Sequence, residues 1–375
     1  MRSPYTGLHP KAFWRSGVVE SHPLSVEELY IKKFTIRPTD RVATAGSCFA
    51  QRVSTYMRKN GFAVMDVEPP PAALSDETAK NFGYNIYSAR YGNIYTVRQL
   101  LQLAQDAQSG AVDAANIWEK DGRFYDALRP NIEPDGFASV EEVLELRRDH
   151  LAKVNKLFAE MDVFIFTFGL SEAWADRRTG RVFPTAPGTI AGDYDPEIFE
   201  FKNFRFNDIY DDFLAFRDLV HERNPKLKIL LTVSPVPMTA TATDKHVLAA
   251  NTYLKSLLRT VAGELSDAHP DIDYFPGYEM VATPFSKAFF YDSNLRTVSP
   301  AGLTAVMRIF FDQHGAVSAP AAERSRAETR EARRQEKAER RAARPRAARP
   351  VAGAAAQSAD DAVCEDILLE TFAPQ

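Results

Sequence analysis

Cysteine, long apolar runs and excess charge are all scarce in this sequence of 375 residues. Its two cysteines, Cys48 and Cys364, exclude a secreted scaffold built on several disulfides, and a reducing compartment is expected. No run of about 18 apolar residues occurs, and the N-terminal stretch lacks the apolar core of a signal peptide. The formal net charge of -4 excludes a strongly basic nucleic-acid binder. These absences predict an ordinary cytoplasmic protein without a membrane span.

The small net charge hides two regions of opposite sign. Residues 321–350 contain 11 Lys or Arg and 5 Glu, a net of +6, which leaves -10 for the rest of the chain. Residues 316–358 almost lack large apolar side chains, so they are predicted to be a disordered or solvated helical linker. A basic arm for nucleic acid is the alternative, but interspersed Glu and missing aromatics disfavour it. Residues 359–375 regain an apolar stripe and are predicted to form a short amphipathic segment.

Strands and helices alternate between residues 35 and 315. Nearly continuous apolar runs are typical of strands covered on both faces, and apolar residues three and four apart are typical of helices. This alternation predicts one α/β domain with a central parallel sheet between helical layers, preceded by an N-terminal extension over residues 1–34. The predicted strands are residues 41–45, 62–67, 162–168, 228–233 and 272–275, and the predicted helices are 49–60, 97–108, 140–160, 208–223, 244–265 and 300–311.

Polar and nucleophilic residues follow four of the predicted strands. Ligands of open α/β sheets bind beyond the carboxyl ends of the strands, so these segments are expected to meet at one edge. The first segment, Gly46-Ser47-Cys48, puts a serine and a cysteine at a tight strand-to-helix turn. A helix N-terminus favours an ionised nucleophile, and its N–H groups can bind an oxyanion. An inert buried cysteine in a small turn is the alternative interpretation.

Six sequence strings follow one another from residue 46 to residue 280: GSCFA, NIYSARYGNIYTVRQLLQL, FTFGLSEAW, LLTVSPVP, DKHVLAANTYLKSLLR and YFPGYEM. In this order they resemble the GSCFA family, which is named for the first string and belongs to the SGNH, or GDSL-like, hydrolase superfamily. The resemblance spans roughly residues 35–312. It implies a flavodoxin-like three-layer α/β/α sandwich and an esterase or acyltransferase. The implied substrates are acyl esters, O-acetylated saccharides among them, with an acyl donor as a further partner.

The first superfamily motif, Gly-Asp-Ser, ends in the nucleophile. In register, Cys48 takes that position and Gly46 stays at the end of the strand. A shift of one residue gives the position to Ser47 instead. The resemblance therefore implies a Cys48 or Ser47 nucleophile.

The remaining superfamily motifs imply an oxyanion hole. The backbone N–H groups of residues 47–48 and of Gly92 are expected to line it. Ser171 and Glu172 stand where the superfamily has Asn and Asp, and Asn93 is a substitute amide donor. Arg90 is a candidate contact for an anionic substrate or acyl carrier.

The usual base of the superfamily, the His of an Asp-x-x-His string, is missing, because Ser299 stands where it would fall. His246, near a predicted helix start, is the best replacement, with Asp244 or Glu279 to orient it. A surface histidine at a helix start is the alternative interpretation. The missing base also leaves open a second function, a non-catalytic ligand-binding module on the same fold.

Motifs for other chemistries are absent. The sequence has no GxGxxG after a strand, no GxxxxGK, no HExxH and no CxxC pair. No cofactor and no metal are therefore expected.

Overall fold

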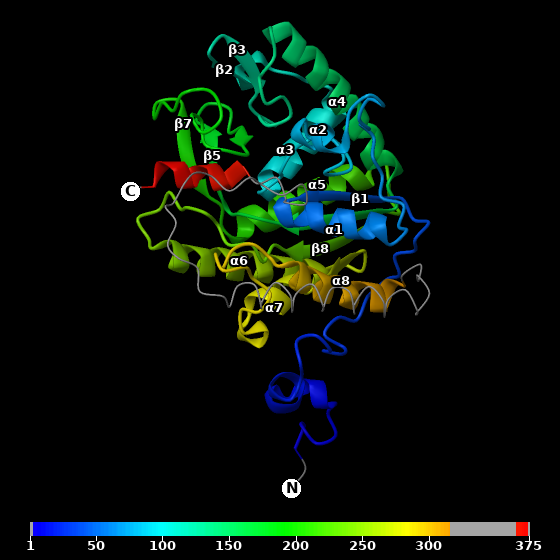
Figure 1. Cartoon of the computed structure of the whole chain (residues 1–375). Helices are drawn as coiled ribbons and strands as arrows, with labels where there is room; N and C mark the ends of the chain where they lie inside the picture. Colours follow the sequence, from blue (N-terminus) through cyan, green and yellow to red (C-terminus); the bar gives the residue numbers. More distant parts are fainter. Residues whose placement is uncertain (1–2, 316–364, 374–375) are drawn as a thin grey trace, which may run out of the picture. The chain divides into compact units, whose positions relative to one another are not determined.

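Four of the predicted strands form a parallel sheet at the centre of the fold (Figure 1). The computed structural model describes residues 3–315 and 365–373, which belong to one compact unit. The strands are β1 (Val42–Gly46), β4 (Val163–Phe168), β8 (Lys228–Val233) and β9 (Ile272–Tyr274), in the order β1-β4-β8-β9. Gly46 pairs with Thr167, and Phe168 pairs with Val233. This register brings the carboxyl ends of β1, β4 and β8 to one edge.

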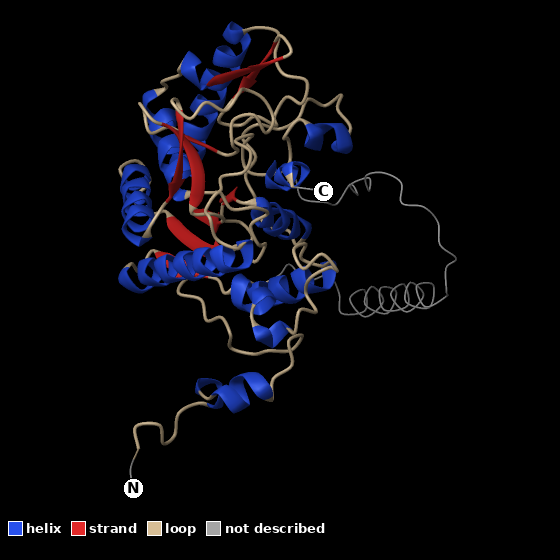
Figure 2. Cartoon of the chain, turned by 90° about the vertical axis from the view of Figure 1, so that its left-hand side faces the viewer, coloured by secondary structure: helices blue, strands red, loops and turns tan. Residues whose placement is uncertain are grey.

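Each face of the central sheet contributes side chains to an apolar core, because successive side chains of a strand point to opposite sides. In β4, Phe164 and Phe166 join one core, whereas Val163 and Ile165 join the other. The first core is covered by α3 (Val97–Ser109), α4 (Val140–Glu160), α5 (Phe206–His221) and α6 (Val247–Ala268), and the second by α1 (Cys48–Lys59), α7 (Gly277–Ala282) and α8 (Pro300–His314). Figure 2 shows helices flanking the strands. The predicted three-layer α/β/α fold is confirmed.

All six predicted helices are present, with ends shifted by at most a few residues. The capping residues explain where several of them begin. Thr96 caps α3 in a reciprocal pair with Gln99, and Ser139 caps α4 by accepting the Glu142 N–H. The structure adds the short helices α2 (Asp76–Asn81) and α7, which the sequence analysis did not predict.

One predicted strand is wrong. Residues 62–67 form only an isolated parallel bridge, between Val42 and Val64. The Val42 N–H donates to Ala63 O and its carbonyl accepts from Met65, but farther along β1 the Thr44 N–H donates to the Ser88 hydroxyl at 3.0 Å. Because that donor is occupied, the ladder ends after one residue.

A small antiparallel sheet, not predicted from the sequence, follows β4. It consists of β5 (Glu172–Asp176), β6 (Val182–Phe183) and β7 (Phe199–Asn203) in the order β6-β5-β7. A separate hairpin pairs β2 (Ile117–Lys120) with β3 (Arg123–Asp126). The short helical turns are η1 (Pro10–Ala12), η2 (Arg15–Val19), η3 (Ala114–Asn116), η4 (Pro284–Ser286) and η5 (Glu365–Phe372). Since only three residues lie between the end of β4 and the start of β5, the small sheet extends from the carboxyl edge of the central one.

The later part of the predicted N-terminal extension packs on the second core. Val26 and Tyr30 of the extension belong to that core, together with Ile36 just after it. The Tyr30 hydroxyl donates to the Asp273 carboxylate at 2.8 Å, and its ring meets Phe275 edge-on with centroids 5.3 Å apart. This attachment ties the extension to β9.

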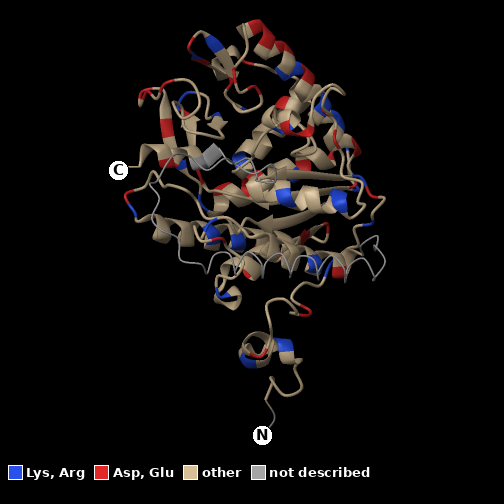
Figure 3. Ribbon diagram, in the orientation of Figure 1, with Lys and Arg blue, Asp and Glu red and all other residues tan. Residues whose placement is uncertain are grey.

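Charged side chains are nearly excluded from the central sheet, where Lys228 and Asp273 are the two exceptions (Figure 3). Both signs are mixed over the helices and loops. In the described ranges, no helix has the length and apolar character needed to cross a membrane. The predicted linker, residues 316–358, with its basic stretch 321–350, and the start of the C-terminal segment, residues 359–364, lie outside the described residues.

Acid is expected to weaken the fold through a buried histidine. His150 is fully buried, and its Nδ1 lies 2.7 Å from the Glu68 carboxylate. Burial and the charge of Arg129 lower the pKa of His150 to about 4, from about 6.5 in the unfolded chain. The unfolded state therefore binds the extra proton between pH 6.5 and 4, and the free energy of unfolding falls across this window by up to about 3 kcal/mol.

Urea unfolding of the full chain at several pH values measures this slope. His150→Gln is expected to flatten it, whereas His9→Gln, at an exposed position, is expected to leave it unchanged. A slope that is the same in the wild type and in His150→Gln would contradict this assignment.

Candidate functional site

A glycine fixes the turn from β1 into α1. Gly46 has φ +133°, in the region that favours glycine, and a methyl group there would lie 2.4 Å from Thr167 O. Ser47 is the N-cap residue, and its N–H donates to the same carbonyl at 3.3 Å. Cys48 is the first residue of α1. The residue-47 N–H, one of the predicted oxyanion donors, is thus bound within the sheet, and the nucleophile position falls at the helix N-terminus.

Both candidate nucleophiles are buried at this turn. Ser47 is 3% exposed and Cys48 is 5% exposed. Within the part of the chain that the structure describes, Ser47 Oγ has no hydrogen-bond partner. The next two residues, Phe49 and Ala50, each join an apolar core, but Cys48 belongs to none of the apolar clusters of the described residues. The thiol is therefore enclosed by the fold at the start of α1.

Asn93 is held against the first turn of α1 by two side chains. Gln51, three residues after Cys48 and so on the same helix face, donates from Nε2 to Asn93 Oδ1 at 2.9 Å. The Tyr87 hydroxyl contacts the same Oδ1 and lies 3.1 Å from the carbonyls of both Gly46 and Ser47, so its single proton is shared among three acceptors. Because Oδ1 receives both contacts, the Asn93 Nδ2 group points to the opposite side. The contacts with Gln51 and Tyr87 thus fix the acceptor Oδ1, rather than the predicted donor Nδ2, on the side that faces the turn.

The carboxyl end of β4 touches the turn through Gly169. A methyl group at Gly169 would lie 2.9 Å from Ser47 Cβ and 3.1 Å from Tyr95 O, so only glycine fits. The Gly169 carbonyl accepts from Lys255 Nζ at 3.0 Å, and Lys255, on α6, is only 2% exposed. The buried Lys255 is thus bound to the carbonyl of Gly169, the residue that packs against Ser47.

The sequence analysis missed Lys255, Gln51 and Tyr87. A signal for Lys255 exists, because it lies on the inner face of α6 with Leu254 and Leu258, where a charge is rare without a partner or a function. The roles of Gln51 and Tyr87 depend on contacts between distant segments, so no local pattern could reveal them.

Gly92 and Arg90 lie on the loop that carries Asn93. Gly92 adopts a left-handed conformation with φ +69°. Arg90 is mostly buried: its guanidinium donates to Phe82 O at 2.9 Å and Ile132 O at 3.0 Å and lies over the Tyr84 ring. These contacts make Arg90 a brace between loops.

Ser171 and Glu172 lead from β4 into β5. The buried Ser171 hydroxyl donates to Asn203 Oδ1 at 2.8 Å. The Glu172 carboxylate accepts from Thr241 Oγ1 at 2.8 Å and from the Ala242 N–H at 3.2 Å, and burial raises its pKa. Both side chains hold neighbouring segments in place.

The predicted base, His246, and the two carboxylates predicted to orient it lie on different elements. His246 is exposed and caps α6, because its Nδ1 accepts the Leu248 N–H at 3.1 Å. A neutral ring in this position carries its proton on Nε2. Asp244 is exposed in the preceding loop, whereas Glu279 accepts from Arg259 and from Tyr274. Among the described residues, no hydrogen bond joins His246 to Asp244 or Glu279.

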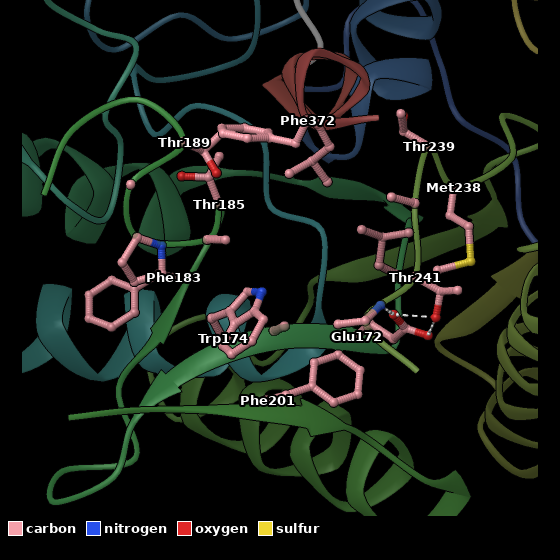
Figure 4. A pocket seen from close by; sticks show the side chains of 18 of the residues that line it. Glu172, Trp174, Phe183, Thr185, Thr189, Phe201, Met238, Thr239, Thr241 and Phe372 are labelled. Atoms are coloured by element: carbon pink, nitrogen blue, oxygen red, sulfur yellow. Dashed lines mark hydrogen bonds between the residues drawn. The ribbon is translucent and has the colours of Figure 1, made fainter. Parts of the chain in front are cut away.

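A cavity of about 650 Å³ lies against the small sheet, and we call it the β5 cavity (Figure 4). Leu170, the residue after Gly169, lines it. Figure 4 shows Trp174 and Phe201 on one side and Phe372, from η5, on the opposite side. Its other walls include Glu172, Phe183, Met238 and Thr241. The cavity is therefore connected through two consecutive residues to the turn that holds the candidate nucleophiles.

The described residues contain no group of three or more His, Cys, Asp or Glu side chains placed to hold a metal ion.

Comparison with known proteins gives one match. The model of the GSCFA family matches residues 41–310, which include the central sheet and every candidate site residue. No curated protein and no solved structure matches the chain. Because the family model covers well over half of the sequence, the chain belongs to the GSCFA family.

Proposed function

We propose that this chain is an esterase or acyltransferase with Cys48 as its nucleophile. The Cys48 thiolate attacks the carbonyl carbon of an acyl ester, the carbon–oxygen bond to the alcohol breaks, and the alkoxide takes a proton as it leaves. The resulting thioester passes its acyl group to water or to an acceptor hydroxyl, which regenerates the thiol. The observation that carries this proposal is the Cys48 thiol itself, buried at a helix N-terminus beside the carboxyl ends of parallel strands.

Two kinds of donor support stabilisation of the tetrahedral oxyanion. The first turn of α1 directs backbone N–H groups outward from its N-terminus. The Asn93 side chain, whose Oδ1 is held by Gln51 and Tyr87, carries the Nδ2 amide that is proposed as a side-chain donor. We propose that Asn93 and the N–H groups of the first turn hold the oxyanion, with the Gly92 N–H beside them.

A thiol is a fitting nucleophile for a site in which, among the described residues, no base contacts the neighbouring serine hydroxyl. Part of a thiol population is ionised near pH 7 without help, whereas a serine hydroxyl needs a base in contact. His246 is proposed to carry the proton, and that role requires the ring to leave its capping position on α6. Ser47 as nucleophile would need a base in contact with its Oγ, and the described residues supply none.

Purified full-length protein should hydrolyse p-nitrophenyl esters or acetylated sugars. His246→Asn separates two roles of this residue, because asparagine also caps helices but carries no base. We expect this variant to keep its stability and to lose roughly 10²-fold in rate or more. A rate unchanged in His246→Asn would remove the residue from the mechanism, and no turnover of any ester by the wild type would refute the enzyme proposal.

A non-catalytic binding module is the second candidate function. It is favoured by Ser299, which stands at the usual base position and caps α8 by accepting the Gly302 N–H at 3.2 Å. Such a module would bind an ester without turning it over, so the same assays separate the two functions.

A further inference from the structure

The walls of the β5 cavity are mainly aromatic and aliphatic. Trp174 and Phe201 are cross-strand partners on β5 and β7 with ring centroids 5.7 Å apart, and Tyr194 meets Trp174 edge-on at 5.0 Å. Met238 extends this surface from the loop after β8. A ligand that fills such a space gains free energy by removing apolar area from water.

The charged groups in these walls do not suit an anionic ligand. Among the described lining residues, the charged side chains are Glu172 and Glu370, and both are acidic. The Glu172 carboxylate is turned toward the loop after β8, where it accepts from Thr241 Oγ1 and the Ala242 N–H (Figure 4). With no cation lining the described walls, the cavity favours an uncharged apolar group.

The size of the β5 cavity exceeds what an acetyl group needs. At ~30 Å³ for each water molecule, 650 Å³ corresponds to roughly 20 waters. An acetyl group would fill a small part of this volume and leave the aromatic walls wet. A longer acyl chain would cover them.

The C-terminal segment completes the cavity. Leu369, Phe372 and Ala373 line it, although they follow α8 by more than 50 residues in the sequence. Phe372 is 66% exposed, so its ring forms a rim. A ligand in the cavity would therefore contact both the small sheet and η5.

We propose that the β5 cavity, with η5 as one of its walls, binds the apolar chain of the acyl ester. The substrates are then esters of medium-length acyl groups rather than acetyl esters. This inference rests on the proposed function, since Leu170 is one of the residues that line the cavity and the adjoining Gly169 packs against Ser47.

Titration calorimetry of the full chain with 1-alkanols, from butanol to decanol, tests the cavity without any turnover. Each added methylene is expected to tighten binding roughly fourfold until the cavity is full. Wild type and Cys48→Ala should bind equally, because alkanols need no nucleophile. Alkanol binding that depends on chain length, without turnover of any ester, would support the β5 cavity as an apolar binding site and refute the enzyme proposal. Ester turnover together with alkanol binding that does not depend on chain length would support the enzyme proposal and refute the role of the cavity.

Single-residue variants test whether octanol binds in the β5 cavity. Trp174→Ala is expected to weaken octanol binding roughly tenfold, whereas Trp14→Ala, at a residue 71% exposed, is the matched control and should have no effect. Phe372→Ser should weaken it a few-fold, and its exposed position keeps this test informative if Trp174→Ala does not fold. Equal affinity of wild type, Trp174→Ala and Phe372→Ser for octanol, or tighter binding of an acetylated sugar than of octanol, would overturn the proposal.

Discussion

Replacing Cys48 with alanine is expected to lower kcat/KM for a p-nitrophenyl ester by roughly 10³-fold or more. The substitution removes the attacking sulfur and leaves the other groups in place. Alanine is smaller than cysteine and suits the first turn of a helix, so the fold should be preserved. Initial rates of purified full-length proteins, with circular dichroism as the check on folding, measure the effect.

Two further variants make the result specific. Cys364→Ala removes the other cysteine and should keep the wild-type rate. Ser47→Ala removes the buried hydroxyl next to the nucleophile and should cost less than Cys48→Ala. If Ser47→Ala abolished turnover and Cys48→Ala kept it, the nucleophile would be the serine and the motif would be shifted by one residue.

Gly46→Ala is expected to destabilise the protein by roughly 3–5 kcal/mol. The new methyl group would lie 2.4 Å from Thr167 O and 2.8 Å from Thr167 N, and both atoms belong to the backbone of β4. The φ of +133° adds strain for any residue with a Cβ. The free energy of unfolding from urea titrations measures the loss.

Gly110→Ala is the matched control for this prediction. Gly110 ends α3 with φ +69°, and no heavy atom lies within 4 Å of the position that its Cβ would take. Only backbone strain changes there, so a cost of about 1–2 kcal/mol is expected. Equal losses in the two variants would show that the close approach of β1 to β4 does not constrain the turn.

The parts of the fold that the sequence predicts are those with one dominant local signal. The runs VFIFTF and KILLTV are buried on both faces and have no polar alternation, so they read as parallel strands. The predicted helices have apolar stripes long enough to mark their faces. In contrast, β5 to β7 are short and partly exposed, and residues 62–67 look like a strand but lose their ladder to the Ser88 side chain. Such competition between side chain and backbone is not visible locally.

The candidate site likewise has one part that the sequence predicts and one part that only the folded chain shows. The turn at residues 46–48 could be predicted because strand, glycine and helix are adjacent in the sequence. Lys255 and Tyr87 reach this edge from α6 and from a loop, and only the folded chain shows that they contact Gly169 O and the Ser47 carbonyl. The capping role of His246 likewise depends on where α6 begins. The sequence names candidate side chains, and the three-dimensional contacts select among them.

The most direct measurement is to locate a trapped acyl group. Full-length protein is mixed with p-nitrophenyl butyrate, quenched in acid and digested, and the peptides are analysed by mass spectrometry. Our account predicts a butyryl group on the peptide containing residues 47 and 48, released by neutral hydroxylamine as a thioester is, absent in Cys48→Ala and retained in Ser47→Ala. A protein that hydrolyses the ester but carries its acyl group on another peptide, or on this peptide in Cys48→Ala, would contradict it.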